Sequence, residues 1–272
     1  VVDTPISEAT IVSAAVGAAM SGLRPVVEIM FMDFITLAMD ALVNQAAKAR
    51  FMFGGKTSVP MVVRTPHGGG LSAGPQHSQC LEAWFAHVPG LKVVCPSSPQ
   101  DAYSLLRSAI DDEDPVIFVE HKGLYGVRGE VDTSVKVPIG QAVVRRHGRA
   151  LTLVTYGATV AVCLAAAKHL AEHDRIDVEV IDLRSLQPWD KATVLASVSK
   201  THRVAIVHEA VQAFGVGAEI AACIAEEAFD ELDAPVMRVG APFMPVPFAR
   251  SLEKQYAVDE AKVRAAVHRL ML

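Results

Sequence analysis

Short apolar runs recur along the chain and alternate with longer segments that mix apolar and polar residues. We expect strands at residues 26–31, 59–64, 91–95, 115–120, 151–155, 178–182, 204–208 and 236–239. Uninterrupted apolar strands separated by helical segments are typical of parallel sheets that helices cover on both faces. The pattern therefore predicts an α/β fold with mostly parallel sheets.

The intervening segments have helical periodicity. A long helix is expected from Asp33, as its N-cap, because the following apolar residues, from Phe34 to Leu42, fall on one stripe. Ser98 followed by Pro99 is typical of a cap residue and a first helical position. Further helices are expected at residues 81–85, 159–172, 190–200, 217–229 and 259–271.

Residues 126–148 form the one long interval in which the alternation stops. We place a domain boundary there, because boundaries fall where the pattern of core-forming elements is interrupted. The sequence thus predicts two domains, residues 1–135 and 136–272, each with a mostly parallel sheet and helices on both faces.

Composition excludes several classes of protein. The 272 residues are 51% hydrophobic and 20% charged, which favours a sizeable folded core over disorder. A net charge of −5 without a basic stripe argues against nucleic-acid binding. No apolar stretch reaches the roughly 18 residues of a membrane helix. The four cysteines form no CxxC pair, so we interpret them as buried thiols of a reducing compartment, not as disulfides or zinc ligands.

Common catalytic and nucleotide-binding motifs are incomplete. Gly55-Lys56-Thr57 resembles the end of a P-loop, but Arg50 stands where the first glycine is required. Gly215-Val216-Gly217 lacks the third glycine of a dinucleotide fingerprint, because Ile220 occupies that place. Serine hydrolase and zinc protease motifs are missing as well. The chain also has no Gly-Asp-Gly segment of the kind that holds magnesium and a diphosphate.

Several longer segments resemble one enzyme family. They include Asp-Thr-Pro-Ile-Ser-Glu-Ala-Thr-Ile at residues 3–11, Gln-His-Ser-Gln at 76–79, Ala-His-Val-Pro-Gly-Leu-Lys-Val-Val at 86–94, and Phe-Gly-Val-Gly-Ala-Glu-Ile at 214–220. These segments are similar to the beta subunits of thiamine-diphosphate-dependent 2-oxo acid dehydrogenases, such as pyruvate dehydrogenase, and of acetoin dehydrogenase. The resemblance implies a transketolase-like pyrimidine-binding domain followed by a transketolase C-terminal domain.

The resemblance also implies an activity and partners. A beta subunit of this family pairs with an alpha subunit in a heterotetramer and shares thiamine diphosphate with it, while the alpha subunit holds magnesium. The reaction would be oxidative decarboxylation of pyruvate or cleavage of acetoin, with acyl transfer to lipoyl groups of a dihydrolipoyl acyltransferase core. The location would be the bacterial cytoplasm or the mitochondrial matrix. The alternatives are a branched-chain 2-oxo acid dehydrogenase subunit and a non-catalytic, truncated relative.

Two residues carry the implied chemistry. By resemblance, Glu8 hydrogen-bonds a ring nitrogen of the cofactor's aminopyrimidine and activates the cofactor, whereas from spacing alone it is a first-turn glutamate of a helix capped by Ser7. His77 would be an acid or base at the active site, although a histidine in a polar loop is also typical of a solvated surface. The resemblance places Ile6, Met30 and Phe34 around the aminopyrimidine, and an ordinary core stripe is the alternative.

Two further expectations follow from the family. A structural potassium ion would be bound largely through backbone carbonyls near Met61, Ala109, Ile110, Asp112 and Asp114. Family members also have a helix and a strand ahead of Asp3, and the absence of an initiator Met before Val1 indicates that upstream sequence is missing. Without that strand, the first sheet would present an unpaired edge.

Overall fold

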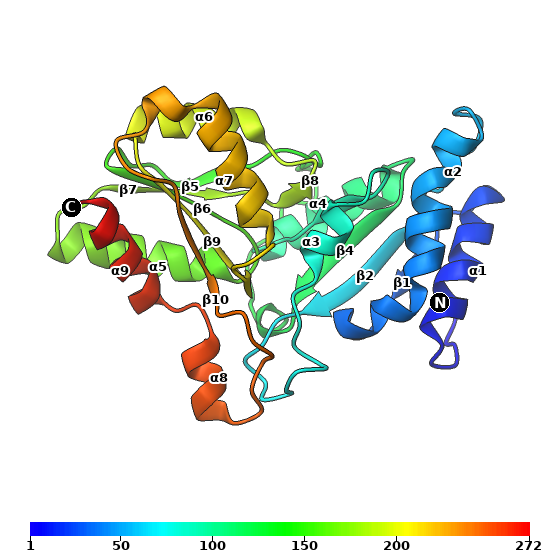
Figure 1. Cartoon of the computed structure of the whole chain (residues 1–272). Helices are drawn as coiled ribbons and strands as arrows, with labels where there is room; N and C mark the ends of the chain where they lie inside the picture. The colour runs from blue at the N-terminus through cyan, green and yellow to red at the C-terminus, as the bar shows by residue number, and fades with distance from the viewer.

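Two five-stranded sheets lie next to each other and organise the whole chain, as the computed structural model of residues 1–272 shows (Figure 1). The first sheet has the order β1 (Val26–Glu28), β2 (Val62–His67), β4 (Val116–His121), β3 (Lys92–Val94) and β8 (Ser185–Gln187). The second has the order β10 (Met237–Ala241), β9 (Val204–Val211), β6 (Leu151–Thr155), β7 (Val178–Asp182) and β5 (Val143–Arg146). Only β8 and β5 run antiparallel to their neighbours, so the predicted α/β class with mostly parallel sheets is confirmed.

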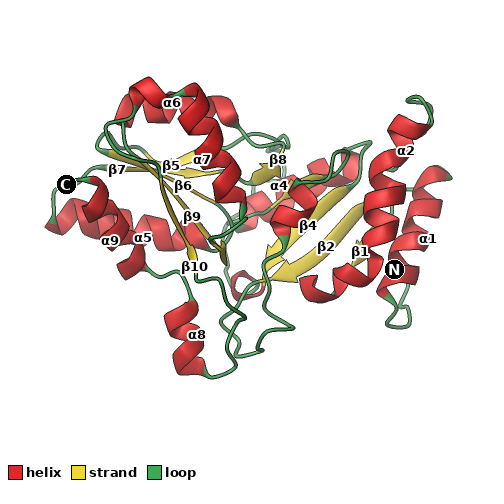
Figure 2. Cartoon of the chain, in the orientation of Figure 1, coloured by secondary structure: helices red, strands yellow, loops and turns green.

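Helices cover both faces of each sheet (Figure 2). On the first sheet, α1 (Glu8–Met20), the 3₁₀ segment η1 (Met32–Ala38), the π segment η2 (Asp40–Ala46) and α2 (Ala47–Met52) share one face, and α4 (Pro99–Asp111) covers the other. On the second sheet, α6 (Lys191–Thr201) and α7 (Val216–Glu227) lie opposite α5 (Thr159–His173) and α9 (Glu260–Leu270). The remaining helices are α3 (Glu82–Ala86), η3 (Lys122–Leu124), η4 (Phe229–Glu231) and α8 (Arg250–Tyr256). None of the helices combines the length and the apolar character needed to cross a membrane.

One apolar core joins the two sheets. The largest cluster contains 37 buried residues and includes Val63 and Ile117 of the first sheet together with Val154 and Ile206 of the second. Two smaller clusters fill the outer faces, under α4 and under α5 with α9. Because burial of apolar area is the main stabilising contribution, the two halves stabilise each other through this shared core.

A strand from the second half of the sequence completes the first sheet. In β8, Gln187 pairs with Val93 and Ser185 pairs with Val94 of β3. The sequence pattern did not predict β8, nor β5, which lies within the interval chosen for the domain boundary. The division into residues 1–135 and 136–272 remains a prediction.

Two predicted helix caps differ in the structure. The helix expected from Asp33 begins one residue earlier, at Met32, and passes through 3₁₀ and π turns before α2. The Asp33 carboxylate does not cap this helix and accepts hydrogen bonds from Gln79 instead. Ser7 stands at the N-cap of α1 but donates its hydroxyl to Thr10 at 2.9 Å. The cap at Ser98 is confirmed, since its oxygen accepts the Asp101 amide at 3.1 Å.

Candidate active site

Glu8 is the first residue of α1, and its carboxylate forms no hydrogen bond or ion pair within the chain. The residue as a whole is 8% exposed, but its carboxylate oxygens are not among the fully buried unpartnered atoms, so solvent reaches them. The positive end of the α1 dipole stabilises the negative charge at this position. Glu8 is therefore free to bond to a molecule from outside the chain.

His77 lies in the loop after the glycine-rich segment, with its ring against two aromatic side chains. Its ring centroid is 4.9 Å from that of Phe31 and 5.3 Å from that of Phe34, and both pairs meet edge to face. The Lys122 ammonium donates hydrogen bonds to the carbonyls of His77 and Gly68. The imidazole is thus held by packing and by its backbone, which is the rigid support that a catalytic group needs.

Asp33 holds the same loop through Gln79, a contact that the sequence did not predict. Its Oδ1 accepts the Gln79 side-chain amide at 2.9 Å and the Gln79 backbone amide at 3.2 Å. Its Oδ2 is buried with no partner. The residue type suggested a helix cap, and no local signal distinguishes a cap from a long-range acceptor.

The structure brings together some of the predicted site residues. Phe34 belongs to η1 and touches His77, and α1, which begins at Glu8, packs on η1. Ile6 and Met30 are 78% and 45% exposed, so they enclose no pocket within this chain. We call Ile6, Glu8, Met30 and Phe34 the cofactor wall, and their role in cofactor binding remains a prediction.

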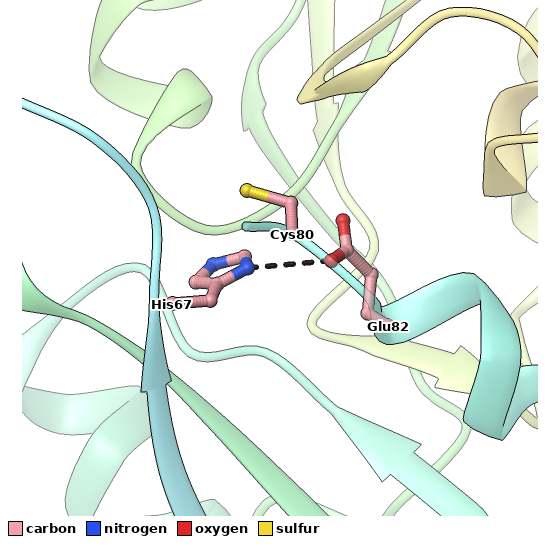
Figure 3. Close-up of side chains that lie close together, drawn as sticks. All are labelled: His67, Cys80 and Glu82. Atoms are coloured by element: carbon pink, nitrogen blue, oxygen red, sulfur yellow. Dashed lines mark hydrogen bonds and ion pairs between the residues drawn. The ribbon is translucent and has the colours of Figure 1, made fainter. Parts of the chain in front are cut away.

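A second polar cluster is buried at the junction of the two sheets (Figure 3). His67 Nδ1 lies 3.3 Å from Glu82 Oε2, and the Tyr156 hydroxyl donates to Glu82 Oε1 at 2.8 Å. Cys80 points into the space beside this pair. Burial alone would lower the pKa of His67, but the Glu82 carboxylate outweighs it and raises that pKa. Burial raises the pKa of Glu82, whereas the charge and hydrogen bond of His67 lower it, with a net decrease. Folding therefore favours the ionic form of this pair.

An acidic residue of the second sheet holds the glycine-rich loop. Glu209, in β9, lies 2.6 Å from His121 Nε2 and accepts the Gly69 amide at 2.8 Å. Burial raises the pKa of Glu209, but the hydrogen bond and charge of His121 lower it to about 2. Gly68 has a φ of +89°, and a Cβ there would lie 2.2 Å from His121 Nε2, so only glycine fits. Glu253 of α8 accepts the amides of Gly70 and Ser72 at 2.8 and 3.0 Å.

Three of the five residues expected near potassium, Ile110, Asp112 and Asp114, are bonded to basic side chains. Arg24 Nη1 donates to the carbonyls of Ile110 and Asp112, each at 2.9 Å. Lys92 Nζ lies 2.7 Å from both carboxylate oxygens of Asp112, and Asp114 pairs with Arg50. The Met61 carbonyl accepts the Val116 amide, and Ala109 is buried in α4. The potassium site remains a prediction, and in this arrangement cationic side chains supply the charge that an ion would bring.

A cavity of about 590 Å³ opens beside the His77 loop, between the two halves of the chain. Gln76, Cys80 and Trp84 line it from the first half, and Glu209 and Tyr256 from the second. Residues 243–246 contribute apolar groups to the wall from the second half. A concave, mostly apolar space with a few polar groups is the usual form of a ligand site or of a path to one.

Comparisons with known proteins agree on one family. Family models for the transketolase pyrimidine-binding domain and the transketolase C-terminal domain match residues 1–128 and 140–263. The chain is 47% identical to acetoin:2,6-dichlorophenolindophenol oxidoreductase subunit beta of Cupriavidus necator, over 99% of this chain and 80% of that protein. It is 47% identical to pyruvate dehydrogenase E1 component subunit beta-2, mitochondrial, of Oryza sativa subsp. japonica, over 98% and 72%.

Two further matches widen this comparison. The chain is 44% identical to 2-oxoisovalerate dehydrogenase subunit beta of Bacillus subtilis, over 99% of this chain and 83% of that protein. Among solved structures, a split gene transketolase described as an inactive beta4 tetramer superposes with a TM-score of 0.82 at 24% identity. That match covers 97% of this chain and 81% of the other, and it supports the fold alone.

Proposed function

The chain belongs to the family of E1 beta subunits of pyruvate and acetoin dehydrogenases, and we propose that it works as such a subunit in an oxidoreductase complex. The reaction is oxidative decarboxylation of pyruvate or cleavage of acetoin, with transfer of the acyl group to lipoyl groups. One relative named for acetoin and one named for pyruvate are equally similar to this chain, at 47% identity each. The observation that carries the proposal is the carboxylate of Glu8, which has no partner within the chain and begins a helix packed against the element that holds Phe34.

The residues of this wall fit the aminopyrimidine ring of thiamine diphosphate. A ring nitrogen of the aminopyrimidine accepts a hydrogen bond, and Glu8 would donate one to it through a protonated carboxyl group. The flat ring needs apolar contacts, which Phe34, Met30 and Ile6 provide from positions that are at least partly exposed. When bound, thiamine diphosphate supplies the electron sink for cleavage of the bond next to the substrate carbonyl. In this proposal Glu8 holds a proton at the ring nitrogen and keeps it in place during turnover.

His77 is proposed to move a proton at the substrate. Its imidazole is held edge-on by Phe31 and Phe34, while Lys122 fixes its backbone. An imidazole can both donate and accept a proton, which suits it to this role. The chain neighbours of His77, Gln76 and Ser78, line the cavity beside its loop.

The proposal requires partners. Ile6 and Met30 are exposed on the cofactor wall, so an alpha subunit would complete the pocket and hold the diphosphate and magnesium. We propose a heterotetramer of two alpha and two beta subunits that binds a dihydrolipoyl acyltransferase core. The domain division at residue 135 belongs to the same proposal. Potassium has less support, because Arg24 already donates hydrogen bonds to two of the predicted carbonyl ligands, those of Ile110 and Asp112.

A branched-chain 2-oxo acid substrate is the second candidate, favoured by the 44% identity to the Bacillus subtilis subunit. Co-expression with the alpha subunit separates the candidates. The reconstituted enzyme is assayed with pyruvate, acetoin and a branched 2-oxo acid, with an artificial electron acceptor, in the presence and absence of thiamine diphosphate and magnesium. We expect cofactor-dependent turnover of pyruvate or acetoin. Turnover of the branched acid alone would select the second candidate, and no turnover of any of the three would contradict the proposal.

A further inference from the structure

Three side chains with metal-binding atoms converge outside the proposed active site. The ligand atoms of His67, Cys80 and Glu82 all lie within 4.8 Å of one another. His67 ends β2, Cys80 lies in the loop that follows His77, and Glu82 begins α3, so ordered backbone positions each of them. The cysteines of this chain were not expected to be zinc ligands, because their spacing contains no metal motif. The fold assembles the set from separate segments instead.

The distance between His67 and Glu82 suits two ligands of a tetrahedral ion better than a charge-assisted hydrogen bond. In a tetrahedral zinc site with metal–ligand bonds of about 2.0 Å, two nitrogen or oxygen ligands lie about 3.3 Å apart. His67 Nδ1 and Glu82 Oε2 are 3.3 Å apart. A charge-assisted hydrogen bond between such groups is usually about 2.7–2.9 Å long. A nitrogen, a thiolate and a carboxylate are also ligands that zinc accepts together.

Charge and access fit a divalent cation as well. A neutral imidazole, a thiolate and a carboxylate together carry two negative charges, so a divalent ion makes the buried set neutral. Glu82 Oε1 is held by the Tyr156 hydroxyl, which orients Oε2 toward the cluster. Cys80 also lines the cavity of about 590 Å³, which gives an ion a path from solvent and leaves room for a fourth ligand. The positive charge of Lys122 disfavours a cation near Cys80, and the negative charge of Glu209 offsets this repulsion.

We propose that His67, Cys80 and Glu82 bind one divalent cation of the zinc class, with the fourth position open to water. Binding displaces the Cys80 thiol proton and the proton shared by His67 and Glu82, so protons are released as the ion enters. The ion would stabilise the junction of the two sheets, because Tyr156 of the second half supports a ligand from the first half. None of the three ligands belongs to the cofactor wall, although Cys80 follows His77 by three residues in the same loop.

Cobalt(II) binding to the full chain tests the proposal, after removal of metals with a chelator under reducing conditions. We expect one ion per chain, with the visible bands of tetrahedral cobalt and a thiolate-to-cobalt charge-transfer band in the near ultraviolet. Zinc should displace the cobalt and raise the melting temperature. Cys80→Ser should abolish the charge-transfer band and weaken binding more than about 100-fold, beyond the usual cost of losing a group that only supports a ligand.

Matched variants distinguish ligands from supports. His67→Gln and Glu82→Gln should weaken binding as Cys80→Ser does, whereas Tyr156→Phe should weaken it by about 10–100-fold. Cys223→Ser, which changes a half-buried thiol of α7, should bind like the unmodified chain. An octahedral spectrum without charge transfer, or equal affinity in Cys80→Ser and the unmodified chain, would overturn the proposal. If a ligand variant fails to fold, the stoichiometry and spectrum of the unmodified chain decide alone.

Discussion

Tyr156 donates a 2.8 Å hydrogen bond to Glu82 across the junction of the two sheets. Tyr156 directly follows β6 of the second sheet, whereas Glu82 begins α3 beside the first. Both residues are buried, at 2% and 0% exposure. A hydrogen bond to a charged acceptor in such a place contributes more than a surface contact, because loss of the donor leaves a buried carboxylate oxygen unsatisfied. This bond therefore links the stability of one half to that of the other.

Tyr156→Phe should lower the free energy of unfolding by about 1.5–3 kcal/mol, the usual contribution of a hydrogen bond to a charged group. Urea denaturation followed by circular dichroism measures the change. Tyr103→Phe is the control, because the Tyr103 hydroxyl contacts only the exposed Arg107 and its loss should cost within about 0.5 kcal/mol. Equal effects of the two substitutions would show that the Tyr156 bond does not couple the halves.

Glu8→Gln should separate catalysis from architecture. The amide keeps the shape of the side chain but removes the acid, so folding and assembly should barely change. Turnover of the reconstituted enzyme should fall about 10²-fold or more, the scale for loss of a positioned acid or base. Turnover and thiamine diphosphate titration are measured on the same tetramer, with Glu226→Gln as an exposed control. Near-normal turnover of the Glu8 variant would make Glu8 a structural residue.

His77→Gln should reduce turnover by about 10²–10⁴-fold while leaving the affinity for thiamine diphosphate nearly unchanged. The reason is that His77 is proposed to act on substrate protons, not on the cofactor. His87→Gln, a change at an exposed histidine near α3, is the matched control. If His77→Gln lowers the affinity for thiamine diphosphate as much as it lowers turnover, and His87→Gln lowers neither, the imidazole only supports the pocket.

Stability should fall in acid through Glu209. The pKa of Glu209 in the folded chain, about 2, lies below its ordinary value of 4.5. The contribution of Glu209 to the free energy of unfolding is therefore complete above pH 4.5 and is lost as the pH falls toward 2. The difference sets an upper limit of about 3 kcal/mol. Unfolding by urea from about pH 6 to about pH 3.5 should show a weaker pH dependence for Glu209→Gln than for Glu226→Gln. Parallel curves would refute this assignment.

Light scattering tests the proposed assembly. An obligate interface usually buries more than about 2,000 Å², so mixing with the alpha subunit should give a single species with the mass of a heterotetramer. Large apolar side chains are exposed on the second half, among them Phe214 and Phe243, at 90% and 76%. Such groups are expected to be covered in an assembly. A stable monomer that ignores the alpha subunit would contradict the proposal.

Regular apolar runs predicted much of the fold. The strands at residues 151–155 and 178–182 were predicted with the bounds that β6 and β7 have, because they are continuous buried strands in the middle of a sheet. By contrast, β8 has three residues, too few to show a pattern, and it exists because β3 offers it an edge. The helix α8 is polar, and Glu253 ties it to the amides of the glycine-rich loop. Tertiary contacts define such elements, so local sequence does not reveal them.

Some residues of the candidate sites could also be predicted from local sequence, whereas others could not. Glu8 and His77 were found because each lies in a continuous segment that resembles the family. His67 and Glu82 were missed, since they are 15 residues apart and gain meaning only when β2 and α3 bring them together. Asp33 was predicted to cap a helix because an aspartate carboxylate often accepts hydrogen bonds from a helix N-terminus. In the structure the same carboxylate accepts hydrogen bonds from Gln79.

The pairing of β8 with β3 also sets an order of events during synthesis. Residues 26–121 contain every other strand of the first sheet, and they leave the ribosome well before Ser185. Until Ser185–Gln187 emerges, β3 has a free edge that can pair with another chain. The N-terminal half of a nascent chain is therefore an incomplete folding unit, and translation must continue past Gln187 before it can close its sheet.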